Sequence, residues 1–363
     1  MFLGFSLFYT LFIFQIKMRS LPTEVQLDVL KCLNFEQLFS LKQTNFYFLN
    51  FINKYEGGLA RVKFYELSLV DVEAFDNQEL DSYKTIKLEP LFSDFVLNDR
   101  LTEKWETAIA KSISLFLSES RNRSKEFAVQ LKKAVNEKSD YYILKLPNIP
   151  KSVEELIIVQ FWLEQLFNCA FEIAEFKNIM FNPEMINLLF DNDTTIVKQF
   201  HVKTAAIITD NSTFEKFLEF SLNRFAIYNS FNFLNLEEIS DQQTNILFDI
   251  IINEGNKFPR VWFGFLLQRL HDLIIEYITK SKDVSKMVPA IVLDCILSPN
   301  FKLNERAEKV ENTQEDGLKF TKYQISNIYN PKAKFSFYHQ YPNMPNDDEP
   351  LFMVRINKMK EQN

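Results

Sequence analysis

The sequence predicts an α/β protein that carries a small all-α module near its N-terminus. Closely punctuated helical patterns fill residues 18–60, and apolar strand-like runs alternate with amphipathic helical stretches over residues 61–300. Glycine occurs only 6 times in 363 residues, whereas typical usage of roughly 7% would give about 25. Because phosphate-binding loops need glycine at several positions, this scarcity excludes dinucleotide-binding, P-loop and kinase folds.

Charge and cysteine usage narrow the range of partners. The chain has 41 Lys and Arg against 48 Asp and Glu, a net charge of -7, and no long basic run. We therefore expect no nucleic-acid partner. Cys32, Cys169 and Cys295 are isolated in apolar surroundings, which predicts reduced, buried thiols in a cytoplasmic or nuclear protein.

The first 17 residues form a separate apolar segment. Residues 2–16 are almost wholly apolar, which is short of the about 20 residues that a spanning helix needs. No Lys or Arg precedes the run, and no small-residue cleavage site follows it, as a signal peptide would require. We interpret residues 1–17 as an extension that precedes a start at Met18. The alternatives are a membrane anchor, which would make the protein membrane-associated, and a signal peptide.

Residues 18–60 predict three short helices. Ser20 is a candidate N-cap with Pro22 in the first turn, Asn34 and Asn45 are candidate caps of the second and third helices, and Gly57 with Gly58 ends the third. Apolar residues cover most sides of these helices. A unit of about 40 residues cannot bury that much apolar surface by itself, so either the following domain or another protein must cover it.

A family resemblance follows from these residues. The run Leu21-Pro22-Thr23-Glu24-Val25, followed by the run from Asp28 to Leu33, resembles the F-box, a helical module that binds Skp-family adaptors. The resemblance covers little more than a tenth of the chain, and residues 40–46 depart from the family pattern. It implies a three-helix F-box whose adaptor-binding residues are Leu21, Pro22, Val25, Leu30, Leu33, Leu38 and Leu41.

Beyond the module, strand-like and helical signals alternate. Apolar runs occupy residues 141–146, 174–181, 198–208, 225–233, 260–267 and 290–297, and helical patterns occupy 103–117, 153–167, 214–222, 240–252 and 270–280. From the second run on, the starts are about 24 to 35 residues apart, which fits one strand and one helix per unit. This favours an irregular leucine-rich-repeat-like stack over a doubly wound sheet, which would need glycine turns and a ligand-binding crevice.

The C-terminal part, residues 301–363, predicts a cap on this stack. Residues 300–317 form a charged loop, and residues 318–325, 334–338 and 351–356 alternate like short antiparallel strands between proline-containing turns.

Catalytic chemistry has little support in the sequence. The three histidines, His201, His271 and His339, lie far apart, and no zinc-protease, nucleophile-elbow or paired Cys-x-x-Cys motif occurs. His271 and Asp272 are adjacent on a predicted helix, where neighbours point about 100° apart, so we expect them on the surface. We therefore predict a non-catalytic protein with no catalytic residue, metal site or cofactor.

Together, these features predict a substrate-recognition adaptor. What the resemblance implies is that residues 18–60 bind a Skp-family protein and, through it, a cullin scaffold of a ubiquitin ligase. The larger domain would then hold an unknown protein substrate for ubiquitin-dependent degradation through protein–protein interaction. The alternative is a membrane-tethered or secreted interaction protein that uses residues 1–17.

Overall fold

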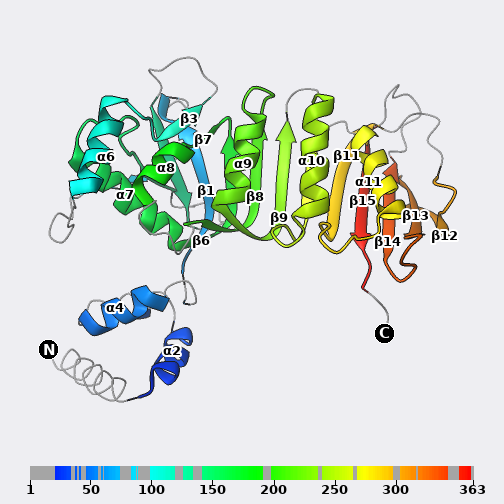
Figure 1. Ribbon diagram of the computed structural model, residues 1–363, viewed down its shortest axis with the longest axis horizontal. Coiled ribbons are helices and arrows are strands. Elements are labelled where there is room, and N and C mark those ends of the chain that lie inside the picture. Colours follow the sequence, from blue (N-terminus) through cyan, green and yellow to red (C-terminus); the bar gives the residue numbers. More distant parts are fainter. Residues whose placement is uncertain are drawn as a thin grey trace. The chain divides into compact units, whose positions relative to one another are not determined.

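The computed structural model divides the chain into two units (Figure 1). The first comprises Met1–Lys63 with Asn168–Ala170, and the second comprises Phe64–Phe167 with Phe171–Asn363. The structure describes residues 21–33, 37–38, 41, 46–55, 59, 61–73, 83–86, 88, 99–118, 126–133, 141–190, 198–235, 239–264, 268–296, 303–315, 318–341 and 351–360. Residues 1–17 and Ser20 lie outside this described part.

Among the described residues of the first unit, α2 (Thr23–Lys31) and α4 (Phe46–Tyr55) are the helices with defined ends, and residues 37, 38 and 41 between them are helical as well. The prediction of a three-helix F-box is therefore wrong as a fold. Leu38 and Leu41, whose spacing predicted a middle helix, are both 3% exposed and belong to a core that residues of α2 and α4 also enter. Burial in this core explains their apolar character, and most of residues 34–45 lies outside the described residues.

The second unit is built on one large mixed sheet. Its strand order is β12-β13-β14-β15-β11-β10-β9-β8-β6-β1-β4-β5-β2. The strands are β1 (Val62–Asp71), β2 (Tyr83–Thr85), β4 (Phe127–Lys132), β5 (Tyr141–Leu144), β6 (Cys169–Lys177), β8 (Phe200–Thr209), β9 (Phe225–Asn235), β10 (Val261–Gly264), β11 (Ala290–Ile296), β12 (Glu308–Glu315), β13 (Leu318–Ser326), β14 (Lys334–Tyr341) and β15 (Leu351–Lys358). A separate pair joins β3 (Phe116–Ser118) to β7 (Ile179–Phe181).

Helices follow the central strands and cover one side of the sheet. They are α6 (Asp99–Ala110), α7 (Val153–Phe167), α8 (Pro183–Phe190), α9 (Phe214–Arg224), α10 (Asp241–Asn253) and α11 (Gln268–Lys280). In Figure 1, α9, α10 and α11 lie in front of the strands. Ring contacts join Phe214 of α9 to Phe233 of β9, and Phe220 of α9 to Phe225 of β9. The phenylalanine excess of the sequence thus fills the space between the helices and the sheet.

The pairing register shows which side chains share each side of the sheet. One buried row crosses seven strands through Tyr323, Phe337, Ile356, Ile291, Val261, Phe231 and Ala205. Since neighbouring residues of a strand point to opposite faces, the residues between these form a second row on the other side. The side chains of this second row are half-buried to exposed, and we call this side of the sheet the open face.

The prediction of a leucine-rich-repeat-like stack is also wrong. Strands β8, β9, β10 and β11 do pair in parallel and in chain order, which produced the regular spacing in the sequence. However, β15, β14, β13 and β12 continue the same sheet in antiparallel order, and β1, β4 and β5 form an antiparallel run near the other end. Hairpins need only short turns, so these flanking strands extend one sheet instead of adding repeat units.

Two local corrections concern residues that were assigned to other elements. Within the charged segment 300–317, residues 308–315 form strand β12, which pairs with β13 and is exposed along its whole length. The helix predicted over 103–117 ends earlier, because Ser112 adopts a left-handed φ of 54° and the Ile113 amide donates to the Ala108 carbonyl.

No helix in the described part of the chain combines the length and apolarity needed to cross a bilayer.

Candidate functional site

The structure divides the seven sequence-predicted adaptor-binding residues into exposed and buried ones. Leu21, Pro22 and Val25 are exposed at the start of α2, with Leu21 at 38% and Val25 at 43% exposure. Leu33 is half-buried. The remaining three are core residues, with exposures of 0% for Leu30 and 3% for Leu38 and Leu41. Only the exposed residues are directly available to a partner in this conformation.

A buried polar contact fixes the start of α2 against α4. Gln26 is 3% exposed, and its Nε2 donates to the Leu21 carbonyl over 2.8 Å. The Tyr47 hydroxyl donates to Gln26 Oε1 over 2.5 Å, and the Tyr47 ring stacks on Phe51 at 5.8 Å. These contacts hold Leu21 beside the first turn, so the exposed apolar side chains are presented by a positioned backbone.

Apolar side chains of α4 are exposed as well. Phe46 is 77% and Tyr47 is 37% exposed. Exposed single apolar residues are common. Here, however, four of them occur in the same small unit, in α2 and α4 or directly before α2: Leu21, Val25, Phe46 and Tyr47. We call these four residues together with Pro22 the helical docking surface.

Cys32 was expected to be a buried thiol, and that expectation is wrong. Cys32 is exposed, just after the last turn of α2, and its Sγ donates to the Asp28 carbonyl at 3.4 Å. Cys169 is buried as expected, and burial raises the pKa of its thiol to about 12. Both cysteines lie in apolar runs of the sequence, so the sequence did not distinguish them. Cys32 is exposed because it follows the last turn of α2.

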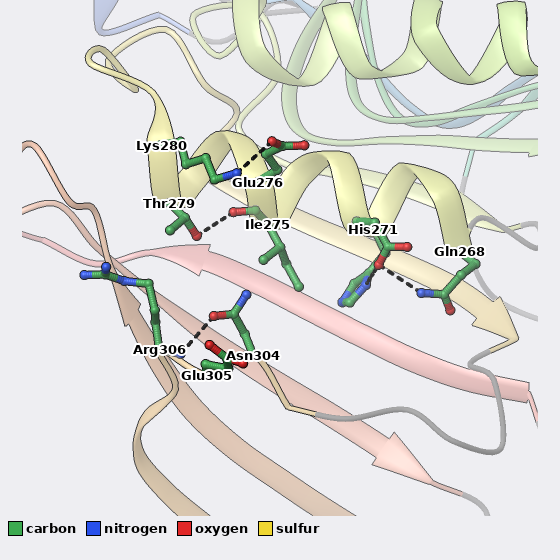
Figure 2. Close-up of a pocket in the computed structure, with 10 residues that line it drawn as sticks. Gln268, His271, Ile275, Glu276, Thr279, Lys280, Asn304, Glu305 and Arg306 are labelled. Atoms are coloured by element: carbon green, nitrogen blue, oxygen red, sulfur yellow. Dashed lines mark hydrogen bonds and ion pairs between the residues drawn. The ribbon is translucent and has the colours of Figure 1, made fainter.

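The second unit contains a cavity beside α11 that the sequence did not reveal. It has a volume of about 650 Å³ and lies between α11 and residues 304–306 (Figure 2). His271 and Ile275 project from α11 toward the strands, whereas Glu276 and Lys280 pair with each other over 3.1 Å on another side of the helix. Its lining mixes acidic, basic and apolar groups.

His271 connects this cavity to a buried polar cluster. It is 1% exposed, so the expectation that His271 lies on the surface is wrong. Its ring packs edge-on against the ring of His339 at 5.8 Å, and His339 Nε2 lies 3.0 Å from the Tyr323 hydroxyl. The spacing from His271 to Ile274 and Ile278 places all three on the buried stripe of α11. This helical spacing is the sequence signal from which the burial of His271 could have been predicted.

The electrostatics of this cluster favour a neutral His339 imidazole. Burial, and then the nearby His271, lower the pKa of His339 to about 3. The carboxylate of Asp272 lies 3.4 Å from His271 Nδ1, and this hydrogen bond is the largest cause that lowers the Asp272 pKa. Among the described residues, no group of three or more His, Cys, Asp or Glu side chains is arranged to hold a metal ion. His201, the remaining histidine, pairs with the Tyr228 hydroxyl on the open face.

Comparison with known proteins gives one family match. A family described as a domain of unknown function, DUF8381, matches residues 86–235, which run from the end of β2 to the end of β9. No F-box family model is matched. A comparison with curated proteins finds no significant match.

Proposed function

We propose that this protein is a non-catalytic adaptor of a ubiquitin ligase. Its helical docking surface binds a Skp-family protein, which joins a cullin scaffold. Its second unit, which we call the sheet domain, holds a protein target for ubiquitination. In this role the protein acts in the cytoplasm or nucleus.

The observation that carries the proposal is the exposure of Leu21, Pro22 and Val25. These residues open the sequence run that resembles the F-box, and they are exposed, whereas Leu30 on the same helix is buried in the core of its own unit. An apolar side chain that the unit does not bury gains free energy when a partner covers it, by about 25 cal/mol for each Å² of apolar area. Aromatic Phe46 and Tyr47 add the residue types that interfaces use most.

The buried members of the predicted set have a positioning role in this proposal. Leu30, Leu38 and Leu41 support the helix that carries the exposed residues. A charged substitution at Leu30 would therefore unfold the unit and would not separate docking from folding. The exposed residues give the cleaner test.

The test is co-expression of the full chain with a Skp-family adaptor, followed by purification through a tag on the adaptor. We expect the wild-type chain to co-purify. Val25→Asp should reduce the recovered chain about tenfold, because a carboxylate would be buried in the interface.

The matched control is Thr23→Asp, which adds the same charge at another exposed position of α2. It should co-purify like the wild type. Failure of the wild type to co-purify, or equal recovery of both variants at wild-type levels, would reject the proposal.

A further inference from the structure

The open face carries a row of aromatic and cationic side chains at the C-terminal half of the sheet. The register aligns Lys322 of β13, Tyr338 of β14, Arg355 of β15, Val292 of β11 and Trp262 of β10. Their strand neighbours, such as Phe337 and Ile356, belong to the buried row under the helices. The alternation of strands therefore places this row on the open face.

Two cations flank one aromatic ring in this row. Lys322 Nζ lies 5.5 Å and the Arg355 guanidinium lies 5.7 Å from the centroid of the Tyr338 ring. Phe320 stacks on the same ring at 5.2 Å. Lys322 and Arg355 are exposed, whereas Tyr338 is half-buried. The ring holds the two charged groups in place, so less side-chain freedom is lost when a ligand binds them.

Neither Lys322 nor Arg355 forms an ion pair with a described carboxylate, although the chain has a net charge of -7. Arg355 Nε instead contacts the Met353 sulfur at 3.4 Å. Two acids neighbour the row on this face. Glu311 of β12 is the cross-strand partner of Lys322, and Asp294 accepts a hydrogen bond of 3.1 Å from Trp262 Nε1. Asp294 thereby positions the indole, which is half-buried beside Val292.

We propose that Lys322, Arg355, Tyr338, Met353 and Trp262 form a binding surface for an acidic protein segment that carries an aromatic or aliphatic side chain between its carboxylates. We call these five residues the cation–aromatic patch. The carboxylates pair with Lys322 and Arg355, and the side chain between them lies on the Tyr338 ring. The continuing segment reaches the Trp262 ring, two strands beyond Arg355. Tyr, Trp, Arg and Met are the residue types enriched in protein interfaces, and complementary charge steers the encounter.

The composition of the patch favours a protein segment over a nucleic acid. A strand of nucleic acid presents a phosphate at every nucleotide and is bound by a continuous basic groove. The patch contains two cations, Glu311 lies opposite Lys322, and Asp294 lies one row away from Arg355. In the adaptor function this segment would belong to the target, so the assignment as substrate site rests on the proposed function. Binding itself is measured without any Skp-family protein.

The probe is a displayed library of random peptides, selected on the full chain. We expect the recovered peptides to be enriched in Asp and Glu flanking an aromatic or aliphatic residue. The best peptide, labelled with fluorescein, is then titrated with the wild type and with Lys322→Glu/Arg355→Glu. Its affinity should fall at least about tenfold in the double variant, because two attractive charges become repulsive.

One control variant and one further test variant make the result specific. Lys332→Glu reverses one exposed charge in the turn before β14 and should leave the affinity within about twofold of the wild type. Trp262→Phe should weaken binding and remove the change in intrinsic fluorescence that binding produces. Enrichment of basic or uncharged peptides, equal affinity for the double variant, or displacement of the peptide by oligothymidylate would overturn the proposal. None of these results depends on whether a Skp-family adaptor binds.

Discussion

Asn327 joins α11 to the turn between β13 and β14, and its removal should destabilise the sheet domain strongly. The side chain is 1% exposed. Its Nδ2 donates to the Ile278 and Ser281 carbonyls over 2.7 and 2.8 Å, and its Oδ1 accepts from the Tyr329 and Asn330 amides, both over 2.9 Å. One side-chain amide therefore provides hydrogen-bond partners for backbone carbonyls at the end of α11 and for backbone amides in the turn after β13.

The expected magnitude follows from these four bonds. Each hydrogen bond contributes about 1 kcal/mol net, and a buried partner left unsatisfied costs about 1–3 kcal/mol. Three of the four bonds are only partly buried, so water replaces some of them. We expect Asn327→Ala to lower the free energy of unfolding by about 2–4 kcal/mol.

The assay is urea unfolding of the purified chain, monitored by circular dichroism. The free energies are compared with the same m-value, the slope of the unfolding free energy against urea concentration, for all variants. Asn330→Ala is the matched control, because exposed Asn330 accepts one bond, from the Lys332 amide at 3.2 Å. It should cost less than about 1 kcal/mol. The reasoning is refuted if Asn327→Ala and Asn330→Ala differ by less than about 0.5 kcal/mol.

Three further predictions concern buried or constrained groups. Because the folded pKa of His339 is about 3, its neutral state stabilises the protein fully above the unfolded pKa of about 6.5. That contribution to the free energy of unfolding is lost as the pH falls from about 6.5 toward 3, by at most about 1.4 kcal/mol per pH unit. The midpoint urea concentration of unfolding should therefore depend less steeply on pH in His339→Gln than in the wild type. Gly255→Ala should cost about 1–3 kcal/mol in the same unfolding assay, because a Cβ at Gly255 would collide with the Met287 backbone carbonyl. Ser240→Ala removes the cap of α10, in which Ser240 Oγ accepts from the Gln243 amide over 3.2 Å, and should lower the melting temperature by an amount equivalent to about 1 kcal/mol.

Sequence patterns located most elements of the sheet domain but not their assembly. The helix predicted over 153–167 coincides with α7, and the run over 290–297 nearly coincides with β11. Local periodicity depends on which side chains face the core, so it is readable from one chain. Strand order depends on contacts between residues far apart in the sequence. The antiparallel strands β13, β14 and β15 were predicted as a separate cap, but their continuation of the central sheet, and strand β12 at its edge, were not.

Two single positions carry no readable signal in the sequence. Ser112 ends α6 in a left-handed conformation where glycine is usual, so no sequence signal marked the end of that helix. Gly264 lies where a Cβ would collide with the Leu234 side chain on the neighbouring strand. The Gly264 position therefore depends on packing against a residue that is distant in the sequence.

The candidate sites were predicted to different degrees. The resemblance at Leu21, Pro22 and Val25 selected residues that are exposed, but it could not separate them from Leu30, which is buried. The cation–aromatic patch combines residues from separate strands, and Lys322 and Trp262 are 60 positions apart in the chain. Sequence spacing gives no indication of such a cluster, because only the pairing register aligns it.

Hydrogen exchange of the full chain, measured by mass spectrometry with and without a purified Skp-family adaptor, tests the adaptor proposal most directly. We predict that the adaptor slows exchange in peptides covering residues 21–33, while exchange in peptides covering β13 and β14 stays unchanged. Exchange in residues 21–33 that is the same with and without the adaptor would contradict the proposed function.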